Sequence, residues 1–163
     1  MKRRTKRWQD PRKKWAPLVG RFVLAFGDIE NVTYLALRQL PKDKIFQTTS
    51  TLGFGKRVDL VIELVKDHAE IGKRLSERFV EKLKAAKKLS ETRNLIAHSP
   101  VVMKVYHHLK EGWTHREIAV ANAKNHDREV SLAGLRQGVT QSERLAKSLY
   151  NLYGKIHMRV VKP

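Results

Sequence analysis

Apolar residues recur at every third or fourth position over four stretches of the chain, which is the spacing of one face of an α-helix. The pattern predicts helices over residues 18–40, from about 56 to 68–72, over 73–97 and over 135–157. Pro41 ends the first helix and Pro100 prevents continuation of the third. Residues 41–55 contain a Thr/Ser run and two glycines, and we expect a loop there.

The pattern changes between the third and fourth predicted helices. Residues 101–106, 117–121 and 128–132 are rich in β-branched residues or alternate in the manner of strands, and the polar segment 124–127 indicates a turn. The fold expected is therefore mainly α: a four-helix bundle over residues 18–163, with a small antiparallel β-hairpin insert at about 101–132 before the last helix.

The first 14 residues contain eight basic residues and one acid, with Trp8 inside the run and Trp15 directly after it. Because Pro11 and Pro17 discourage a continuous helix, we expect residues 1–17 to form a flexible basic arm. Such an arm is either a solvated tail or a nucleic-acid contact in which the cations meet phosphates and Trp8 stacks on a base. The candidate contacts are Lys2, Arg3, Arg4, Lys6, Arg7 and Trp8.

The chain carries 34 Lys and Arg residues against 16 acids, a formal net charge of +18 over 163 residues. This excess predicts attraction to polyanions, with nucleic acid ahead of anionic membranes; a solubilising basic surface and an acidic protein partner are the alternatives. Lys84, Lys87 and Lys88 form a basic outer face on the third predicted helix and are further nucleic-acid candidates.

Several classes are not expected. With no cysteine, disulfides and thiolate metal sites are excluded. The histidines at 107, 108, 115 and 126 lack the spacing of a metal site, so we expect no metal and no cofactor. No apolar stretch predicts a membrane span or a secretory signal, and we therefore expect a cytoplasmic protein without a membrane partner.

Arg93 interrupts the apolar stripe of the third predicted helix. It lies four positions after Leu89 and three before Ile96, where the helical spacing predicts an apolar residue. Burying an unpaired arginine costs several kcal/mol, so its charge must be met by a carboxylate, a second subunit or an anionic ligand. Asp28 and Glu30, midway along the first predicted helix, are the carboxylates available across a bundle. A purely structural ion pair is one interpretation; the other is that Glu30 orients Arg93 toward a cleft.

The segment Arg93-Asn94-Leu95-Ile96-Ala97-His98-Ser99 resembles the Arg-x4-His motif of the HEPN family (higher eukaryotes and prokaryotes nucleotide-binding). The resemblance covers roughly residues 18–100 and the final helix, and it implies a metal-independent endoribonuclease in which Arg93 and His98 are catalytic and Asn94 supports them. It also implies a homodimer with both motifs in a shared cleft. Some members are toxins or defence effectors, which suggests an acidic antitoxin partner; others only bind nucleotides or proteins.

The residue types suit RNA cleavage by the 2′-hydroxyl. Histidine can act as acid or base near neutral pH, and guanidinium binds phosphate oxygens in a fork. However, residues five apart on a helix point about 140° away from each other. Arg93 and His98 can therefore meet only if the helix breaks near Ala97 or if two subunits each contribute one of them. His98 as a simple cationic residue at a helix C-terminus is the structural alternative.

Overall fold

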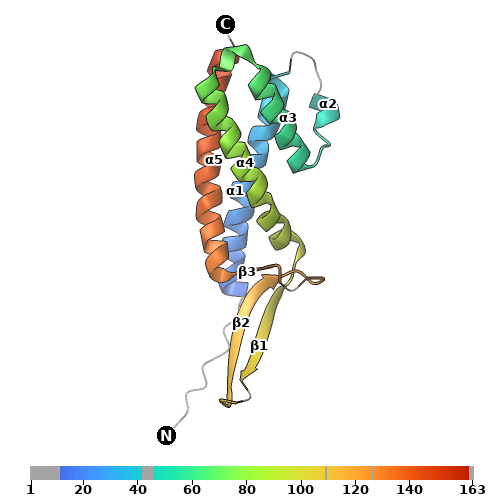
Figure 1. Ribbon diagram of the computed structural model, residues 1–163, viewed down its shortest axis with the longest axis vertical. Helices are drawn as coiled ribbons and strands as arrows, with labels where there is room; N and C mark the ends of the chain where they lie inside the picture. Colours follow the sequence, from blue (N-terminus) through green and yellow to red (C-terminus); the bar gives the residue numbers. More distant parts are fainter. Residues whose placement is uncertain (1–11, 42–45, 109, 126, 162–163) are drawn as a thin grey trace.

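The computed structural model describes residues 12–41, 46–108, 110–125 and 127–161. Its elements, shown in Figure 1, are α1 (Arg12–Gln39), α2 (Phe46–Thr49), α3 (Phe54–Asp67), η1 (Ala69–Ile71), α4 (Lys73–His98), β1 (Val101–His108), β2 (Trp113–Ala121), β3 (Glu129–Ser131) and α5 (Leu132–Val160). The predicted class, mainly α with a small antiparallel sheet before the last helix, is confirmed. The predicted count of four helices is wrong, since the short helix α2 makes five among the described residues.

Helix α1 begins at Arg12, six residues earlier than expected, and Pro17 lies inside it. Pro17 removes the hydrogen bond that residue 17 would donate to the Lys13 carbonyl, and its ring crowds that carbonyl, so other contacts must stabilise this part of the helix. Trp15, which is 3% exposed, anchors this first part of the helix in the core. The predicted arm is therefore wrong for residues 12–17, which belong to the bundle.

Three long helices, α1, α4 and α5, run along the length of the molecule (Figure 1). Helices α1 and α5 are parallel: Arg21 pairs with Glu143 near their N-terminal ends, and Gln39 meets His157 near their C-terminal ends. Helix α4 is antiparallel to both, and α3 packs against α4 and α1 at the end remote from the sheet. The core between these helices is aliphatic and aromatic, with Phe22, Phe26, Phe79, Ile29, Leu37, Leu83, Leu135 and Leu149 among its fully buried side chains.

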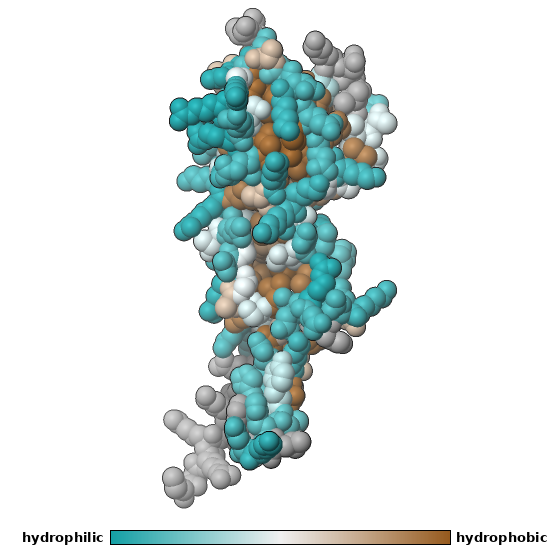
Figure 2. All heavy atoms as spheres, viewed as in Figure 1, coloured by the Kyte–Doolittle hydropathy of each residue, from teal (hydrophilic) through white to brown (hydrophobic). Residues whose placement is uncertain are grey.

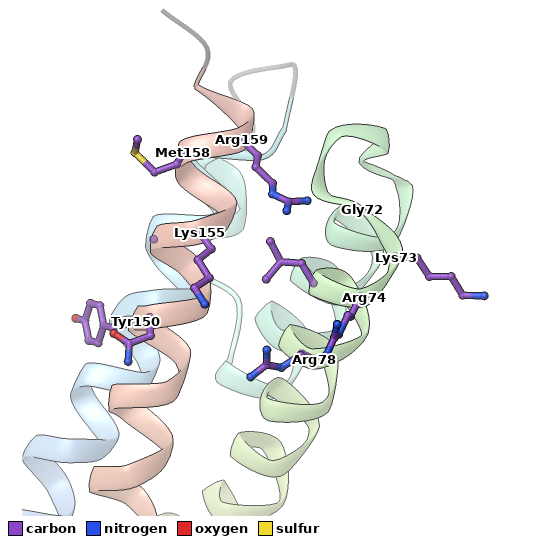
Figure 3. A pocket seen from close by; sticks show the side chains of 11 residues that line it. Gly72, Lys73, Arg74, Arg78, Tyr150, Lys155, Met158 and Arg159 are labelled. Atoms are coloured by element: carbon purple, nitrogen blue, oxygen red, sulfur yellow. The ribbon is translucent and has the colours of Figure 1, made fainter.

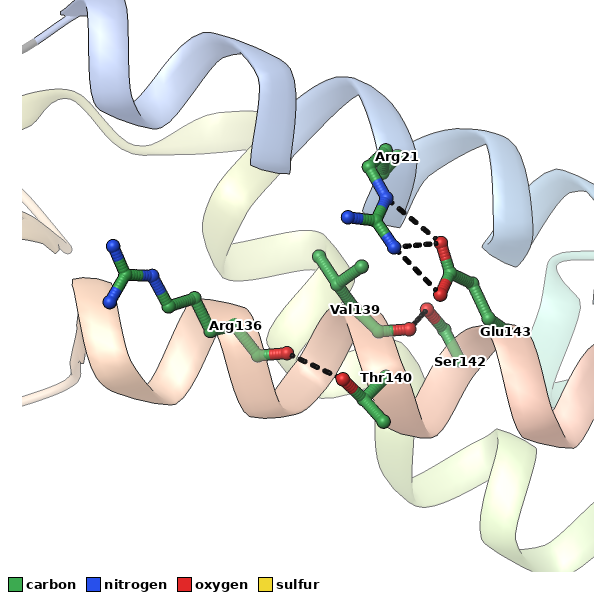
Figure 4. A network of polar contacts seen from close by, with 6 residues as sticks. All are labelled: Arg21, Arg136, Val139, Thr140, Ser142 and Glu143. Atoms are coloured by element: carbon green, nitrogen blue, oxygen red, sulfur yellow. Dashed lines mark hydrogen bonds and ion pairs between the residues drawn. The ribbon is translucent and has the colours of Figure 1, made fainter.

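Polar contacts on the surface tie α1 to α5. The Arg21 guanidinium donates to both carboxylate oxygens of Glu143 at 2.8 to 3.0 Å (Figure 4). Within α5, the Ser142 hydroxyl donates to the Val139 carbonyl at 2.9 Å and the Thr140 hydroxyl to the Arg136 carbonyl at 3.2 Å.

The face in Figure 2 is mostly hydrophilic, with narrow apolar strips between the polar side chains. No described helix combines the length and the apolar character needed to cross a membrane.

The sheet has the order β1-β2-β3, and both pairings are antiparallel. Its long hairpin joins Val101 to Val120 at one end and His108 to Trp113 at the other, and it projects beyond the helices (Figure 1). The end of β2 is buried at Ala119, Val120 and Ala121, whereas the edge strand β1 is largely exposed. Strand β1 is the outer strand of this sheet and carries an apolar row, Val101, Met103 and Val105, on one exposed face.

Candidate nucleic-acid cleft

A cleft of about 620 Å³ lies between α1, the segment leading into α3, and the C-terminal half of α4. We call it the Arg93 cleft. Its lining residues come from three parts of the chain: Phe26 and Glu30; Thr51, Leu52, Gly53, Phe54, Gly55 and Lys56; and Ser90, Arg93 and Asn94. The structure thus brings together two of the three residues of the predicted catalytic group, Arg93 and Asn94, with one of the two predicted acids, Glu30.

Arg93 is half-buried in the wall of this cleft. Its Nη1 donates to Asn94 Oδ1 at 3.2 Å, and its guanidinium carbon lies 5.9 Å from the centre of the Phe26 ring. Among the described residues, no carboxylate lies within ion-pair distance of it. Neighbours that are neutral leave the charge of Arg93 available to an anion in the cleft.

The arginine that is buried among the described residues is Arg57, which the sequence analysis did not single out. It is 5% exposed, donates from Nη1 to the Leu52 carbonyl at 2.6 Å, and stacks on the Tyr34 ring at 4.2 Å. Its Nη2 lies 3.5 Å from Glu30 Oε1. The helical spacing could have predicted its burial, because Arg57 precedes Val61 and Val65 by four and eight positions and so continues the buried stripe of α3.

The contact between Arg57 and Glu30 corrects the role expected for the acids. Glu30 faces the cleft but is paired with Arg57, and no ion pair joins it to Arg93 among the described residues. Asp28 is exposed and is not among the residues lining the cleft. Both carboxylates are thus excluded as ion-pair partners of Arg93, and the purely structural interpretation of Arg93 loses its partner.

The N-terminus of α3 opens into the same cleft. Gly53 precedes the helix, no side chain accepts a hydrogen bond from its first turn, and no acid occupies that turn. Free amides at a helix start favour a negative ligand, and the exposed Lys56 adds a cation beside them. Arg93, Lys56 and these amides give the cleft a positive wall on two sides.

His98 lies outside the cleft. It is the last residue of α4, is exposed, and is not among the lining residues. Helix α4 continues unbroken to His98 and ends at Ser99, so the first of the two alternatives, a helix break near Ala97, does not occur. On a continuous helix Arg93 and His98 diverge by about 140°, so one subunit alone does not bring them together.

The other predicted contacts are dispersed. Lys84, Lys87 and Lys88 are exposed on α4, but Lys87 Nζ lies 2.6 Å from Asp59 Oδ2, so its charge is already matched. Lys2, Arg3, Arg4, Lys6, Arg7 and Trp8 lie outside the described residues. No group of histidine and carboxylate side chains suited to a metal ion occurs in the part of the chain that the structure describes.

Comparison with known proteins gives no assignment: no family, curated protein or solved structure matches this chain.

Proposed function

We propose that this protein is a metal-independent endoribonuclease of HEPN type that holds RNA in the Arg93 cleft. The observation that carries the proposal is a half-buried arginine, at the start of the Arg-x4-His segment and in the wall of a cleft, that no carboxylate of the described residues pairs with. A permanently charged guanidinium in such a place suits a phosphodiester, whose oxygens it can bind in a fork.

The proposed residues have distinct roles. Arg93 binds the scissile phosphate and stabilises the charge that develops on it. His98 supplies the proton transfer, taking the proton of the 2′-hydroxyl or giving one to the departing 5′-oxygen. Asn94 accepts the hydrogen bond from Arg93 and so fixes the direction of the guanidinium. The products are a 2′,3′-cyclic phosphate and a 5′-hydroxyl, and the cleavage requires no cofactor.

The proposed enzyme is a two-fold homodimer in which Arg93 of one subunit acts with His98 of the other. The continuity of α4 supports this arrangement, because it separates the two side chains within one subunit. Strand β1 begins three residues after His98 and exposes Val101, Met103 and Val105, an apolar row suited to a second copy. A C2 dimer is also the commonest oligomer geometry.

The second candidate is a non-catalytic RNA-binding protein, and the position of His98 outside the cleft favours it. This alternative retains the cationic cleft but lacks the proton transfer. An acidic protein of antitoxin type is a further proposed partner, since a net charge of +18 attracts acidic chains as well as RNA.

Incubation with RNA in EDTA separates the two candidates. The nuclease cleaves, leaves 2′,3′-cyclic phosphate ends, and loses about 10²- to 10⁴-fold in rate on His98→Ala. His157→Ala, which alters an exposed histidine on α5 outside the Arg93 cleft, is the matched control and keeps the rate. Binding without cleavage by the unaltered protein would establish the non-catalytic alternative.

A further inference from the structure

A second basic groove lies on another part of the bundle, between α4 and α5. Its wider part, about 960 Å³, is lined by the start of α4 and the end of α5 (Figure 3). Five of its residues are cationic and none is acidic; the cations are Lys73, Arg74, Arg78, Lys155 and Arg159. In Figure 3 the side chains of Arg78, Lys155 and Arg159 point into the space between the helices, whereas Lys73 points away.

The cations form two facing rows. Arg74, Arg78 and Lys82 are four positions apart on α4 and therefore share one face. Lys82 belongs to a second hollow of about 530 Å³ between the same helices, which contains Arg144 of α5 and again no acidic residue. We call these two hollows together the α4–α5 groove; cations and no acidic residue line each of them, although Lys82 Nζ also lies 2.8 Å from Glu81 Oε1.

The other cations of the groove have no ion-pair partner within the part of the chain that the structure describes. Arg74, Arg78 and Lys155 are exposed, and none forms an ion pair with a described residue. Arg159 Nη1 donates to the Ile71 carbonyl at 2.8 Å, which fixes this guanidinium at the mouth of the groove without matching its charge. Lys73 and Arg74 also occupy the first turn of α4, where the helix dipole disfavours cations. A bound polyanion offsets the repulsion between the neighbouring cations and also the repulsion between Lys73, Arg74 and the positive end of the helix dipole.

The dimensions favour a chain of phosphates over a single one. With about 1.5 Å of rise per residue, the cations of α5 from Arg144 to Arg159 extend over about 22 Å. One nucleic-acid strand carries a charge roughly every 3.4 Å along a duplex axis, so the groove spans several phosphates. We propose that the α4–α5 groove is the surface that binds the phosphate backbone of RNA, separate from the Arg93 cleft. This inference rests on the RNA partner proposed above, but not on cleavage.

The test is the affinity of the full chain for a fluorescent single-stranded oligonucleotide of 2′-O-methyl RNA, measured by anisotropy over a range of salt. This probe lacks the 2′-hydroxyl nucleophile, so binding is read without cleavage. The groove variant is R74Q/R78Q/K155Q, which leaves Arg159 and its hydrogen bond in place. The control, K66Q/K110Q/K124Q, removes the same charge from exposed residues that line neither the groove nor the Arg93 cleft.

Each lost phosphate contact reduces the salt slope by about 0.7 for a single strand. We expect the groove variant to lose about 2 from the slope and about 100-fold in affinity at 0.1 M salt, and the control to lose only a few-fold with little change in slope. Lys155→Gln alone, at an exposed position, should lose about 5-fold, which gives a result even if the triple variant fails to fold.

Equal losses of RNA affinity in the groove and control variants would contradict RNA binding by the groove. The absence of any RNA binding by the unaltered protein would contradict it as well. Loss of affinity for polyglutamate but not for RNA would overturn it in favour of an acidic protein partner. Cleavage is measured separately on unmodified RNA in EDTA. If the groove variant binds RNA more weakly but the unaltered protein does not cleave RNA, the proposed nuclease activity is wrong and the proposed binding groove stands. If the protein cleaves RNA but the groove variant binds as well as the control, the binding groove is wrong and the nuclease activity stands.

Discussion

The guanidinium of Arg57 lies 3.5 Å from the carboxylate of Glu30, which lines the Arg93 cleft. The pair is asymmetric, since the Arg57 side chain is 6% exposed and the Glu30 side chain 26%. Burial of Arg57 is tolerated because the Leu52 carbonyl and the Tyr34 ring also contact its guanidinium. One consequence is that Glu30 is engaged, and Arg93 keeps a charge that no described carboxylate matches.

Arg57 should therefore be critical for stability. Truncation in Arg57→Ala removes the contacts to Leu52 and Tyr34 and leaves Glu30 without its cation, which we expect to cost about 3 to 5 kcal/mol. Urea denaturation followed by circular dichroism measures the loss. Arg21→Ala is the control, because its pair with Glu143 is exposed and worth about 0 to 1 kcal/mol. Equal costs for the two variants would contradict the structural role of Arg57.

Arg93 should be critical for activity and of little importance for stability. Arg93→Ala removes a half-buried cation with one hydrogen bond and one ring contact, so the free energy of unfolding should fall by only about 1 kcal/mol. RNA cleavage should fall about 10²- to 10³-fold, the usual effect of removing one group that stabilises transition-state charge. Arg136→Ala, on the exposed surface of α5, should leave the cleavage rate unchanged. If the Arg93→Ala protein were destabilised but fully active, Arg93 would have a structural role and not a role in cleavage.

Gly72 is required where the chain turns into α4. Its φ is +75°, and a Cβ there would lie 2.9 Å from Nη1 of Arg159. We expect Gly72→Ala to destabilise the protein by about 1 to 2 kcal/mol, through backbone strain and displacement of Arg159. Gly20→Ala is the opposite case: it is helical with open space around it and should stabilise by roughly 0.5 to 1 kcal/mol. Thermal unfolding of both variants tests this: the melting temperature should fall in Gly72→Ala and rise in Gly20→Ala.

Tyr153 should make stability sensitive to alkaline pH. Burial raises the pKa of Tyr153 above its ordinary value, and its hydroxyl donates to Gln39 Oε1 at 2.5 Å. Above the unfolded pKa of about 10, the unfolded chain loses this proton more readily than the folded one, so stability falls as pH rises. Below that pH the group contributes no pH dependence. Denaturation of the unaltered protein and Tyr153→Phe on either side of pH 10 should show a steeper alkaline loss in the unaltered protein; parallel curves would exclude Tyr153 as the source.

Local patterns in the sequence were sufficient for much of the fold. Helix α4 was predicted to within one residue because its apolar stripe is long and Pro100 follows it closely. The start of α1 was missed because two prolines outweighed the apolar pattern, whereas burial of Trp15 stabilises a helix that contains Pro17. Helix α2 is one short turn in a segment of Thr and Ser, where no apolar periodicity exists to reveal it.

The site was only partly predictable because it depends on residues that meet in space. Arg93 was found from its place in a stripe, but its relation to Glu30 depended on Arg57, which comes from another helix. The α4–α5 groove was not visible at all in the sequence. Arg78 and Lys155 are 77 positions apart, and only the antiparallel packing of α4 and α5 places them on one groove.

The most direct test of the proposed enzyme is complementation between two inactive variants. Arg93→Ala and His98→Ala are each purified, then mixed so that their subunits exchange, and cleavage of RNA is measured in EDTA. If each site takes Arg93 from one subunit and His98 from the other, a mixed dimer has one intact site of two. Random exchange then restores about one quarter of the unaltered activity. No recovery in a mixture shown to contain mixed dimers would contradict the shared site.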